Sequence, residues 1–208
     1  MAEHATVGDL KHQRNKEARV QERGSQVLSC AGVGRRLVEL IIDKDLLPVE
    51  LHEWLRFADR GASMVLAGPP GSGKTVTAIA AVRLHVAAEI QRTGVWGTPY
   101  RLSYSKAVGL YRAVFEQDQP TLRAARSADL LIIDDLGAAY EHEWPVSEVE
   151  DIVDERWEDS RPTIVTTNLH PDGVEDSLKA RLPRSFDRLT GDPGPGVVIL
   201  DRPSMRRA

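Results

Sequence analysis

Eight consecutive residues, GPPGSGKT, have the spacing of a phosphate-binding loop, with glycines ahead of a lysine and a hydroxyl residue. Glycines let consecutive backbone N–H groups converge on phosphate oxygens, because they accept conformations closed to other residues. Lys74 can set a positive charge against the β- and γ-phosphates, and the Thr75 hydroxyl suits Mg²⁺, which prefers oxygen ligands. The residues predicted to contact the nucleotide are Gly68, Pro69, Pro70, Gly71, Ser72, Gly73, Lys74, Thr75 and Val76.

The segments on either side of this loop are those that a phosphate site needs. Residues 63–67 form a short apolar run that predicts a buried strand, and residues 76–90 read as a helix. A helix that follows the loop points the positive end of its dipole at a bound anion. This context distinguishes the loop from a chance glycine-rich turn and predicts a site for a nucleoside triphosphate.

An acidic pair follows a second apolar run. Residues 130–133 are aliphatic, and the run is too short and too β-branched for a buried helix, which predicts a central parallel strand. Ligands of open α/β sheets bind beyond the carboxyl ends of the strands, so Asp134 is predicted to hold Mg²⁺ together with Thr75. Asp135 is predicted to orient and polarise the attacking water. The alternative is an acidic pair that only forms a turn. Because aspartate is shorter than glutamate, slow hydrolysis is expected.

Two further polar positions complete the predicted site. Asn168 follows the strand predicted at residues 163–167, where its amide can accept from water and donate to a γ-phosphate oxygen. Arg184 and Arg188 lie in RLPRSFDRL, and an arginine delivered by a neighbouring subunit would make hydrolysis depend on assembly. We assign this role to Arg184, with Arg188 as the alternative. A surface arginine paired with Asp187 is the simpler interpretation.

The remaining elements must position these residues. Residues 1–30 are predicted to be a charged helical arm, flexible or partner-binding, that is charge-mixed as far as Gly24, and residues 31–208 an ATPase domain. Strands that alternate with helices predict an α/β fold with a parallel five-stranded sheet flanked by helices. The other expected elements are two helices within residues 37–58 separated at Pro48, a strand at 100–104, helices at 105–115, 121–127, 147–159 and 176–189, and a last strand at 197–200.

Composition narrows the class of protein. The chain has 208 residues, of which 41% are hydrophobic and 28% charged, as in soluble globular proteins. No apolar run has the length of a membrane span and the polar start has no signal-peptide core, so we expect a cytoplasmic protein without membrane contact. The net charge of −4 restricts any nucleic-acid contact to a local patch. The single cysteine, Cys30, excludes an internal disulfide and is expected to be a small buried residue.

Such a patch is expected after the second strand, where basic residues could follow phosphates while tyrosines stack on bases. An amphipathic helix with half-buried tyrosines is an equally good interpretation. The residues concerned are Lys106, Arg112, Arg123, Arg126, Tyr104 and Tyr111. His142 lies between two glutamates, but without a second histidine at ligand spacing a loop is favoured over a metal site.

Taken together, these motifs resemble the AAA+ ATPases, and more narrowly the replicative helicase loaders of the DnaC/DnaI type, including phage-encoded versions, with their IstB transposition-helper relatives. The resemblance rests on GPPGSGKT, IIDDLGAAYEHEW, RPTIVTTNL and PRSFDRL in this order, and it covers residues 31–207. AGVGRR, at residues 31–36, is similar to the stretch near the adenine in that family. This similarity implies a base-binding role for Val33 and Gly34, although Gly34 stands where a proline is common.

The resemblance implies a P-loop NTPase of the AAA+/ASCE class without a C-terminal helical lid. It also implies an ATP- and Mg²⁺-dependent ATPase that self-associates in the ATP state, contacts single-stranded DNA and loads a hexameric replicative helicase, which it grips mainly through its N-terminal segment. Three alternatives stay open. They are an IstB-like helper that binds duplex DNA and activates a transposase, a nucleotide-sensing adaptor with little turnover, and a small-molecule P-loop kinase.

Overall fold

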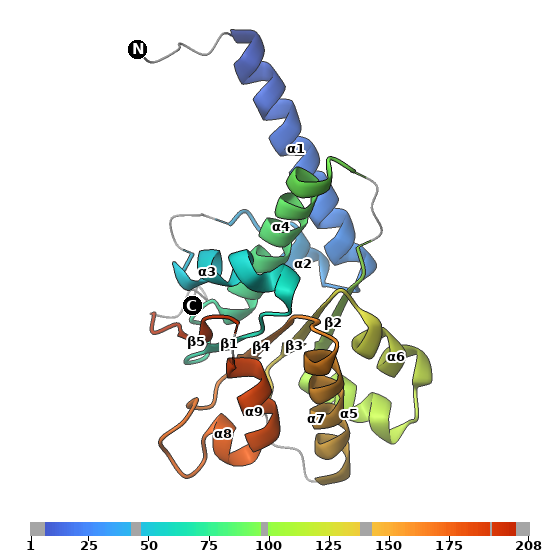
Figure 1. Cartoon of the computed structure of the whole chain (residues 1–208), viewed down its shortest axis with the longest axis vertical. Coiled ribbons are helices and arrows are strands. Elements are labelled where there is room, and N and C mark those ends of the chain that lie inside the picture. The colour runs from blue at the N-terminus through green and yellow to red at the C-terminus, as the bar shows by residue number, and fades with distance from the viewer. Residues whose placement is uncertain (1–6, 43–46, 97–99, 138–142, 192, 203–208) are drawn as a thin grey trace.

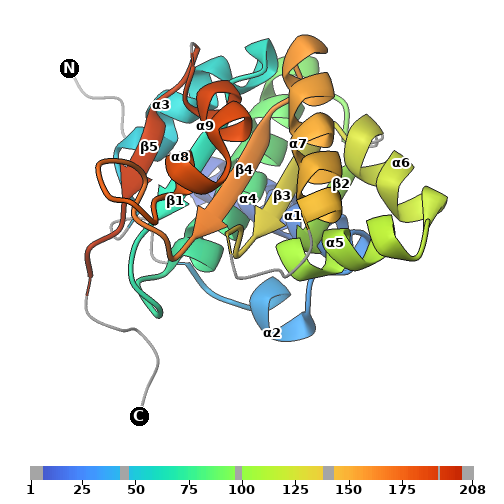
Figure 2. The same ribbon diagram turned by 90° about the horizontal axis from the view of Figure 1, so that it is seen from below.

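Five parallel strands form the centre of the fold. The computed structural model describes residues 7–42, 47–96, 100–137, 143–191 and 193–202. The strands lie in the order β2-β3-β4-β1-β5, which Figure 2 shows across the sheet. They are β1 (Met64–Ala67), β2 (Leu102–Lys106), β3 (Leu130–Asp134), β4 (Thr163–Thr167) and β5 (Gly196–Ile199). The predicted parallel five-stranded sheet is confirmed, with the phosphate-loop strand β1 between β4 and β5.

Helices cover both faces of the sheet (Figure 1). One layer comprises α1 (Val7–Cys30), α2 (Arg35–Val38), α3 (Glu50–Phe57) and α4 (Lys74–Thr93), and a 3₁₀ turn, η2 (Ala58–Arg60), follows α3. The other comprises α5 (Ala107–Phe115), α6 (Gln119–Ser127), α7 (Glu143–Glu158), α8 (Leu178–Arg181) and α9 (Pro183–Thr190). Successive strand residues point to opposite faces. Met64 and Leu66 accordingly pack in the first layer, whereas Val65 and Ala67 pack in the second.

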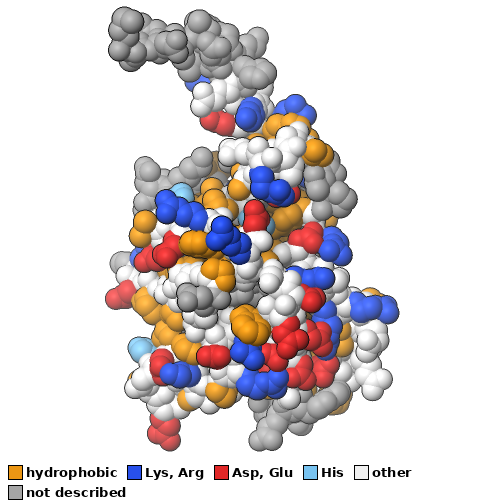
Figure 3. Space-filling view, in the orientation of Figure 1, with side chains coloured by type: hydrophobic (Ala, Val, Ile, Leu, Met, Phe, Trp, Pro, Cys, Tyr) orange, Lys and Arg blue, Asp and Glu red, His pale blue; other side chains and the backbone are white. Residues whose placement is uncertain are grey.

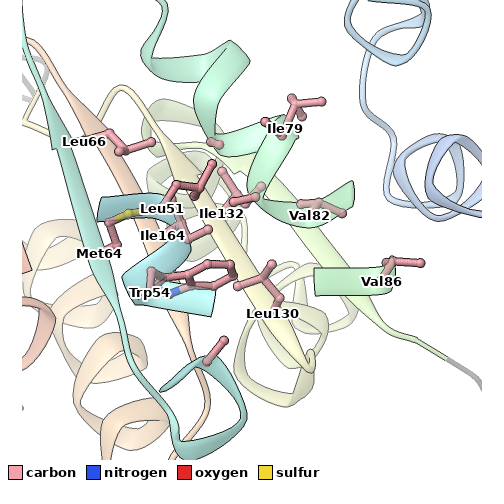
Figure 4. Close-up of a cluster of buried hydrophobic side chains, with 14 of the residues drawn as sticks. Leu51, Trp54, Met64, Leu66, Ile79, Val82, Val86, Leu130, Ile132 and Ile164 are labelled. Carbon is pink, nitrogen blue, oxygen red and sulfur yellow. The ribbon is translucent and has the colours of Figure 1, made fainter. Parts of the chain in front are cut away.

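Trp54 is the largest side chain that is fully buried in the first layer. Figure 4 shows it among other apolar side chains of the sheet and of α3, including Leu51, Met64 and Leu130. Its indole N–H donates to the carbonyl oxygen of Ala62 at 2.8 Å, so the buried polar group is satisfied. This contact anchors the chain just before β1, the strand that ends at the phosphate loop.

Helix α1 continues six residues beyond Gly24, where the charge-mixed stretch ends, and it ends at Cys30, the last residue of the predicted arm. Gly24 is buried, and a Cβ added there would lie 3.2 Å from Cγ of Arg83, so glycine permits a close approach to α4. Val27 and Leu28 belong to the core, whereas the N-terminal half of α1 projects beyond the other elements (Figure 1). Cys30 is exposed at the C-terminal end of α1, so the expected burial is wrong.

Two predicted helical regions are shorter or more divided than expected. Residues 176–189 form two short helices that meet at Leu182, because Pro183 lacks an N–H group and begins α9 instead of continuing α8. The first helix expected within residues 37–58 is the single turn α2, and the second is α3. Among the helices that the structure describes, none combines the length and the apolar character needed to cross a bilayer.

Candidate nucleotide-binding site

The phosphate loop connects β1 to α4 at the carboxyl edge of the sheet. A Cβ at Gly68 would lie 2.3 Å from the carbonyl oxygen of Leu200, the residue after β5, so only glycine fits there. Gly73 is the N-cap of α4 and has a φ of +95°, in the left-handed region that favours glycine. Helix α4 therefore begins at Lys74, with its N-terminus directed at the loop, as phosphate binding requires.

Lys74 is held by the loop that it follows. The residue is only 8% exposed, and its Nζ donates to the carbonyl oxygens of Gly68 at 2.7 Å and Pro69 at 2.8 Å. Carbonyl oxygens are the partners that make a buried ammonium group tolerable. This arrangement keeps a positive charge beside the loop, where a polyphosphate would bind.

Asp134, at the end of β3, accepts hydrogen bonds from hydroxyl groups on three other elements. Its Oδ1 accepts hydrogen bonds from Thr75 Oγ1 at 2.9 Å and from Thr166 Oγ1 at 2.7 Å. Its Oδ2 accepts from the Tyr104 hydroxyl at 3.0 Å. Burial, and then the Asp134 carboxylate, raise the pKa of Tyr104 well above its usual range, so the phenol stays protonated and acts as the hydrogen-bond donor.

The structure thus brings together Thr75 and Asp134, the two residues predicted to hold Mg²⁺. A hydroxyl and a carboxylate oxygen 2.9 Å apart, beside a phosphate loop, suit a cation that takes hard oxygen ligands and shares them with substrate phosphates. The residues present therefore fit the predicted cation, while their role as ligands stays a prediction.

Asp135 and Asn168 also meet, at the ends of the neighbouring strands β3 and β4. Asn168 Nδ2 donates to Asp135 Oδ1 at 2.6 Å, and both side chains are exposed. Asp135 has a φ of +63°, which is uncommon for a residue with a Cβ. Its backbone N–H is held by Thr166 Oγ1 at 2.9 Å. This conformation turns the Asp135 carboxylate away from the buried Asp134 and towards solvent, where it can contact a water molecule.

Arg184 lies on α9 and contacts α7. Its guanidinium forms ion pairs with Asp151 and Asp154, each at 3.2 Å, and its side chain is 53% exposed. Among the described residues, the hydrogen bonds of Arg184 go to α7 and none goes to the phosphate loop. Within one chain, the structure therefore does not bring Arg184 to Lys74, Thr75 or the acidic pair.

Arg188 is held more firmly than Arg184. Its Nε donates to Asp154 at 2.6 Å, and its guanidinium lies 4.1 Å from the centre of the Trp157 ring, a cation–π contact. The hydrogen bond from Arg188 is the main reason that the pKa of Asp154 is lowered. Arg188 also lies 3.5 Å from Asp187, as the simpler interpretation expected. Figure 3 shows acidic and basic side chains gathered over α7 and α9.

The tyrosines predicted to stack on bases are engaged elsewhere, so that prediction is wrong. Tyr111 is 2% exposed inside the second layer, and burial raises its pKa to about 12. Tyr104 packs against the first layer and donates to Asp134. Arg126 forms ion pairs with Glu148 at 2.9 Å and Glu155 at 2.7 Å. Hydrophobic burial of one helix face decides the position of Tyr111, as the alternative interpretation expected.

The exposed face of α5 has a different aromatic residue. Phe115 is 64% exposed and Val108 is 47% exposed, and Arg112 lies between them on the same face. Their spacing of four and three residues is that of one helix face, a signal that the sequence contained. Lys106 and Arg123 are exposed as predicted.

Two further sequence predictions concern residues outside the site proper. Val33 is 6% exposed and its side chain lies in the core, while Gly34 is exposed as the N-cap of α2. A base-binding role for this stretch stays a prediction. His142 lies outside the described residues.

The parallel five-stranded sheet, the phosphate loop and the helices on both faces form a P-loop fold of the AAA+ class. The model of the IstB-like ATP binding protein family matches residues 43–179, which is more than half of the chain. This chain belongs to that family. A comparison with curated proteins gives no match.

Several solved structures have a similar fold. DnaI matches with a TM-score of 0.60 and 17% identity over 83% of this chain and 94% of that chain. A putative primosome component from Streptococcus pyogenes serotype M3 matches with a TM-score of 0.56 and 16% identity over 93% and 100%. The DnaC helicase loader matches with a TM-score of 0.52 and 18% identity over 73% and 85%. The chain spans only about half of a DNA replication initiation factor, 48%, and of DnaA from Aquifex aeolicus, 49%.

Proposed function

We propose that this chain binds ATP with Mg²⁺ at the phosphate loop and hydrolyses the ATP when it is assembled with further copies of itself. The observation that supports this most directly is the convergence of five predicted residues at one edge of the sheet. Thr75 contacts Asp134, Asn168 contacts Asp135, and Lys74 lies in the loop beside them. A phosphate loop alone would serve a binding protein equally well, whereas an exposed carboxylate and amide beside the loop provide groups for hydrolysis.

Each of these residues has a separate part in the proposed reaction. The loop N–H groups and Lys74 bind the phosphates, and Thr75 and Asp134 would hold Mg²⁺, which would neutralise part of the phosphate charge. Asp135 accepts a hydrogen bond from the attacking water and takes up its proton. Asn168 fixes the Asp135 carboxylate and donates to a γ-phosphate oxygen. Catalysis of this kind consists mainly of positioning and charge stabilisation.

Assembly supplies the remaining positive charge. Arg184 is exposed and, among the described residues, forms ion pairs with Asp151 and Asp154, so it is able to change partners when another protomer approaches. We propose that it contacts the nucleotide of the neighbouring protomer. ATP would then favour the assembled state, because the γ-phosphate contacts both protomers, and hydrolysis would release it.

The proposed client is a hexameric replicative helicase, which the protein would load onto single-stranded DNA. The likeness to the DnaI, DnaC and primosome-component chains over most of their length supports this choice. Lys106, Arg112 and Arg123, with the exposed Phe115, are the groups proposed to follow phosphates and stack on a base. The match to the IstB-like family model also favours a second candidate, a transposition helper that binds duplex DNA.

The test combines nucleotide binding with partner recovery. Calorimetry with ATP and Mg²⁺ should show binding to the unmodified chain and none to Lys74→Ala, while Lys179→Ala, an exposed lysine paired with Asp172, should bind normally. A pull-down from the native host with ATP should recover a hexameric helicase with the unmodified chain but not with Lys74→Ala. Recovery of a transposase instead, with a preference for long duplex DNA at matched salt, would establish the second candidate. Absence of any ATP binding would overturn the proposal.

A further inference from the structure

Tyr104 reaches the metal-binding edge of the site from a strand that the nucleotide motifs do not include. It lies on β2, which pairs with β3 so that Lys106 is opposite Asp134 and Tyr104 is opposite Ile132. The tyrosine side chain is long enough to span this offset, and its hydroxyl donates to Asp134 Oδ2 at 3.0 Å. The ring packs against the first layer of the core, which fixes the direction of the hydroxyl.

The three hydroxyl groups on Asp134 are not equivalent. Thr75 belongs to the phosphate-loop helix, and its hydroxyl is itself a predicted Mg²⁺ ligand, so it cannot also be relied on to hold the carboxylate. Thr166 and Tyr104 remain, the first on Oδ1 at 2.7 Å and the second on Oδ2 at 3.0 Å. With one donor on each oxygen, the carboxylate is fixed against rotation about its Cβ–Cγ bond, which is otherwise a soft torsion.

We propose that Tyr104 is a positioning residue that increases the affinity of the site for Mg²⁺ by holding Asp134 in the orientation in which it binds the cation. This inference rests on the proposed nucleotide- and Mg²⁺-binding function. Tyr104 does not contact the nucleotide in this proposal, and it acts only through the carboxylate of Asp134. Hydrogen-bond partners of metal ligands commonly contribute about tenfold or more to metal affinity, which sets the size of the expected effect.

The test variant is Tyr104→Phe, which removes the hydroxyl and keeps the ring in the core. The matched control is Tyr100→Phe. Tyr100 is also partly buried against the first layer, but it lies before β2, and its hydroxyl is 2.6 Å from Nδ1 of His85 instead of near Asp134. The two substitutions therefore remove the same group, one from within β2 and the other from the segment that precedes it.

The measurement is the affinity for ADP and for ATP by titration calorimetry, first with EDTA and then over a series of Mg²⁺ concentrations. In Tyr104→Phe, the Mg²⁺ concentration that gives half of the gain in affinity should rise about tenfold. The affinity in EDTA should equal that of the unmodified chain, which also shows that the loop is folded. Tyr100→Phe should match the unmodified chain in both conditions.

A double-mutant cycle separates positioning from a structural effect. In an Asp134→Asn background, Tyr104→Phe should cause no further change in Mg²⁺ dependence, because its route to the cation is already absent. An unchanged Mg²⁺ dependence in Tyr104→Phe, or an equal loss of affinity in EDTA, would overturn the inference and leave the proposed function intact. Failure of the unmodified chain to bind nucleotide, or to respond to Mg²⁺, would instead overturn the proposed function itself.

Discussion

At the scale of single residues, Asp134 and Asp135 show how neighbouring carboxylates are given different environments. Asp134 is 7% exposed and accepts three hydroxyl hydrogen bonds, whereas Asp135 is exposed and accepts one from Asn168. Asp134 is the last residue of β3 and stays buried between the neighbouring elements, whereas Asp135 follows the strand with a positive φ and its side chain is exposed. One carboxylate is thereby suited to hold a cation and the other to contact water.

The substitution Asp135→Asn should abolish hydrolysis and preserve ATP binding. The amide keeps the shape of the side chain but cannot take a proton from water, so phosphate release should fall by at least about 100-fold. Malachite-green detection of phosphate and calorimetry with ATP measure the two properties. Asp129→Asn, which changes an aspartate paired with Arg101 before β3, should leave both unchanged. Phosphate release at the unmodified rate would show that Asp135 is not the base.

At the scale of elements, Arg156 connects the second helical layer to the sheet. It is 1% exposed on α7, and its guanidinium donates to the carbonyl oxygens of Ala125, Ala128 and Pro162 at 2.7 to 2.9 Å. Burial lowers its pKa to about 10, which still leaves it charged at neutral pH. By satisfying carbonyls at the end of α6 and ahead of β3 and β4, it sets the position of the strands that carry Asp134 and Asn168.

Replacement of Arg156 should therefore destabilise the fold. Arg156→Ala leaves several buried carbonyl oxygens without donors, and we expect the free energy of unfolding to fall by about 3 kcal/mol. Urea denaturation followed by circular dichroism gives this quantity. Arg123→Ala, on the exposed face of α6, should change it by less than about 0.5 kcal/mol. Equal stabilities of the two variants would mean that the carbonyls find other donors.

At the scale of the whole molecule, α7 and α9 form a charged surface in which Asp154 is shared by Arg184 and Arg188. Arg188 has the shorter contact and the Trp157 ring beneath it, so it holds Asp154 in place. Arg184 has the longer contacts and the more exposed side chain. Exposed ion pairs contribute little to stability, so Arg184 can exchange these carboxylates for a nucleotide phosphate bound to a neighbouring protomer. This asymmetry favours Arg184 over Arg188 as the group that crosses to another protomer.

Mixing of two inactive variants tests this arrangement. Arg184→Ala should bind ATP but hydrolyse it on the order of 1,000-fold more slowly, because the transition-state charge is then unbalanced. Mixed with Asp135→Asn, it should recover part of the activity, since some interfaces combine an intact Asp135 with an intact Arg184 from the neighbour. Arg92→Ala, which removes an exposed arginine paired with Glu89 at the far end of α4, serves as the control for loss of a surface arginine. Normal hydrolysis by Arg184→Ala at every protein concentration would exclude a catalytic site to which Arg184 of a neighbouring protomer contributes.

Much of the fold and the centre of the site could be predicted from the sequence alone. A phosphate loop is a contiguous segment whose residue types are dictated by local backbone conformation, and buried parallel strands leave uninterrupted apolar runs such as residues 130–133. Asp134, Asp135 and Asn168 directly follow such runs. Their expected position at the carboxyl edge of the sheet therefore predicted that they lie near one another, as the structure has them.

Only the tertiary structure decided which other side chains serve that site. Tyr104, Tyr111 and Arg156 have partners on segments distant in sequence, and composition does not reveal whether a tyrosine stacks outward, fills a core or donates to a carboxylate. Arg156 occupies the same helix face as Val149, Ile152 and Val153, a position where apolar patterning predicts burial but not the carbonyls that satisfy a charge. Hydrogen bonds and packing between layers exist only once the layers meet, which is why these roles could not be read along the chain.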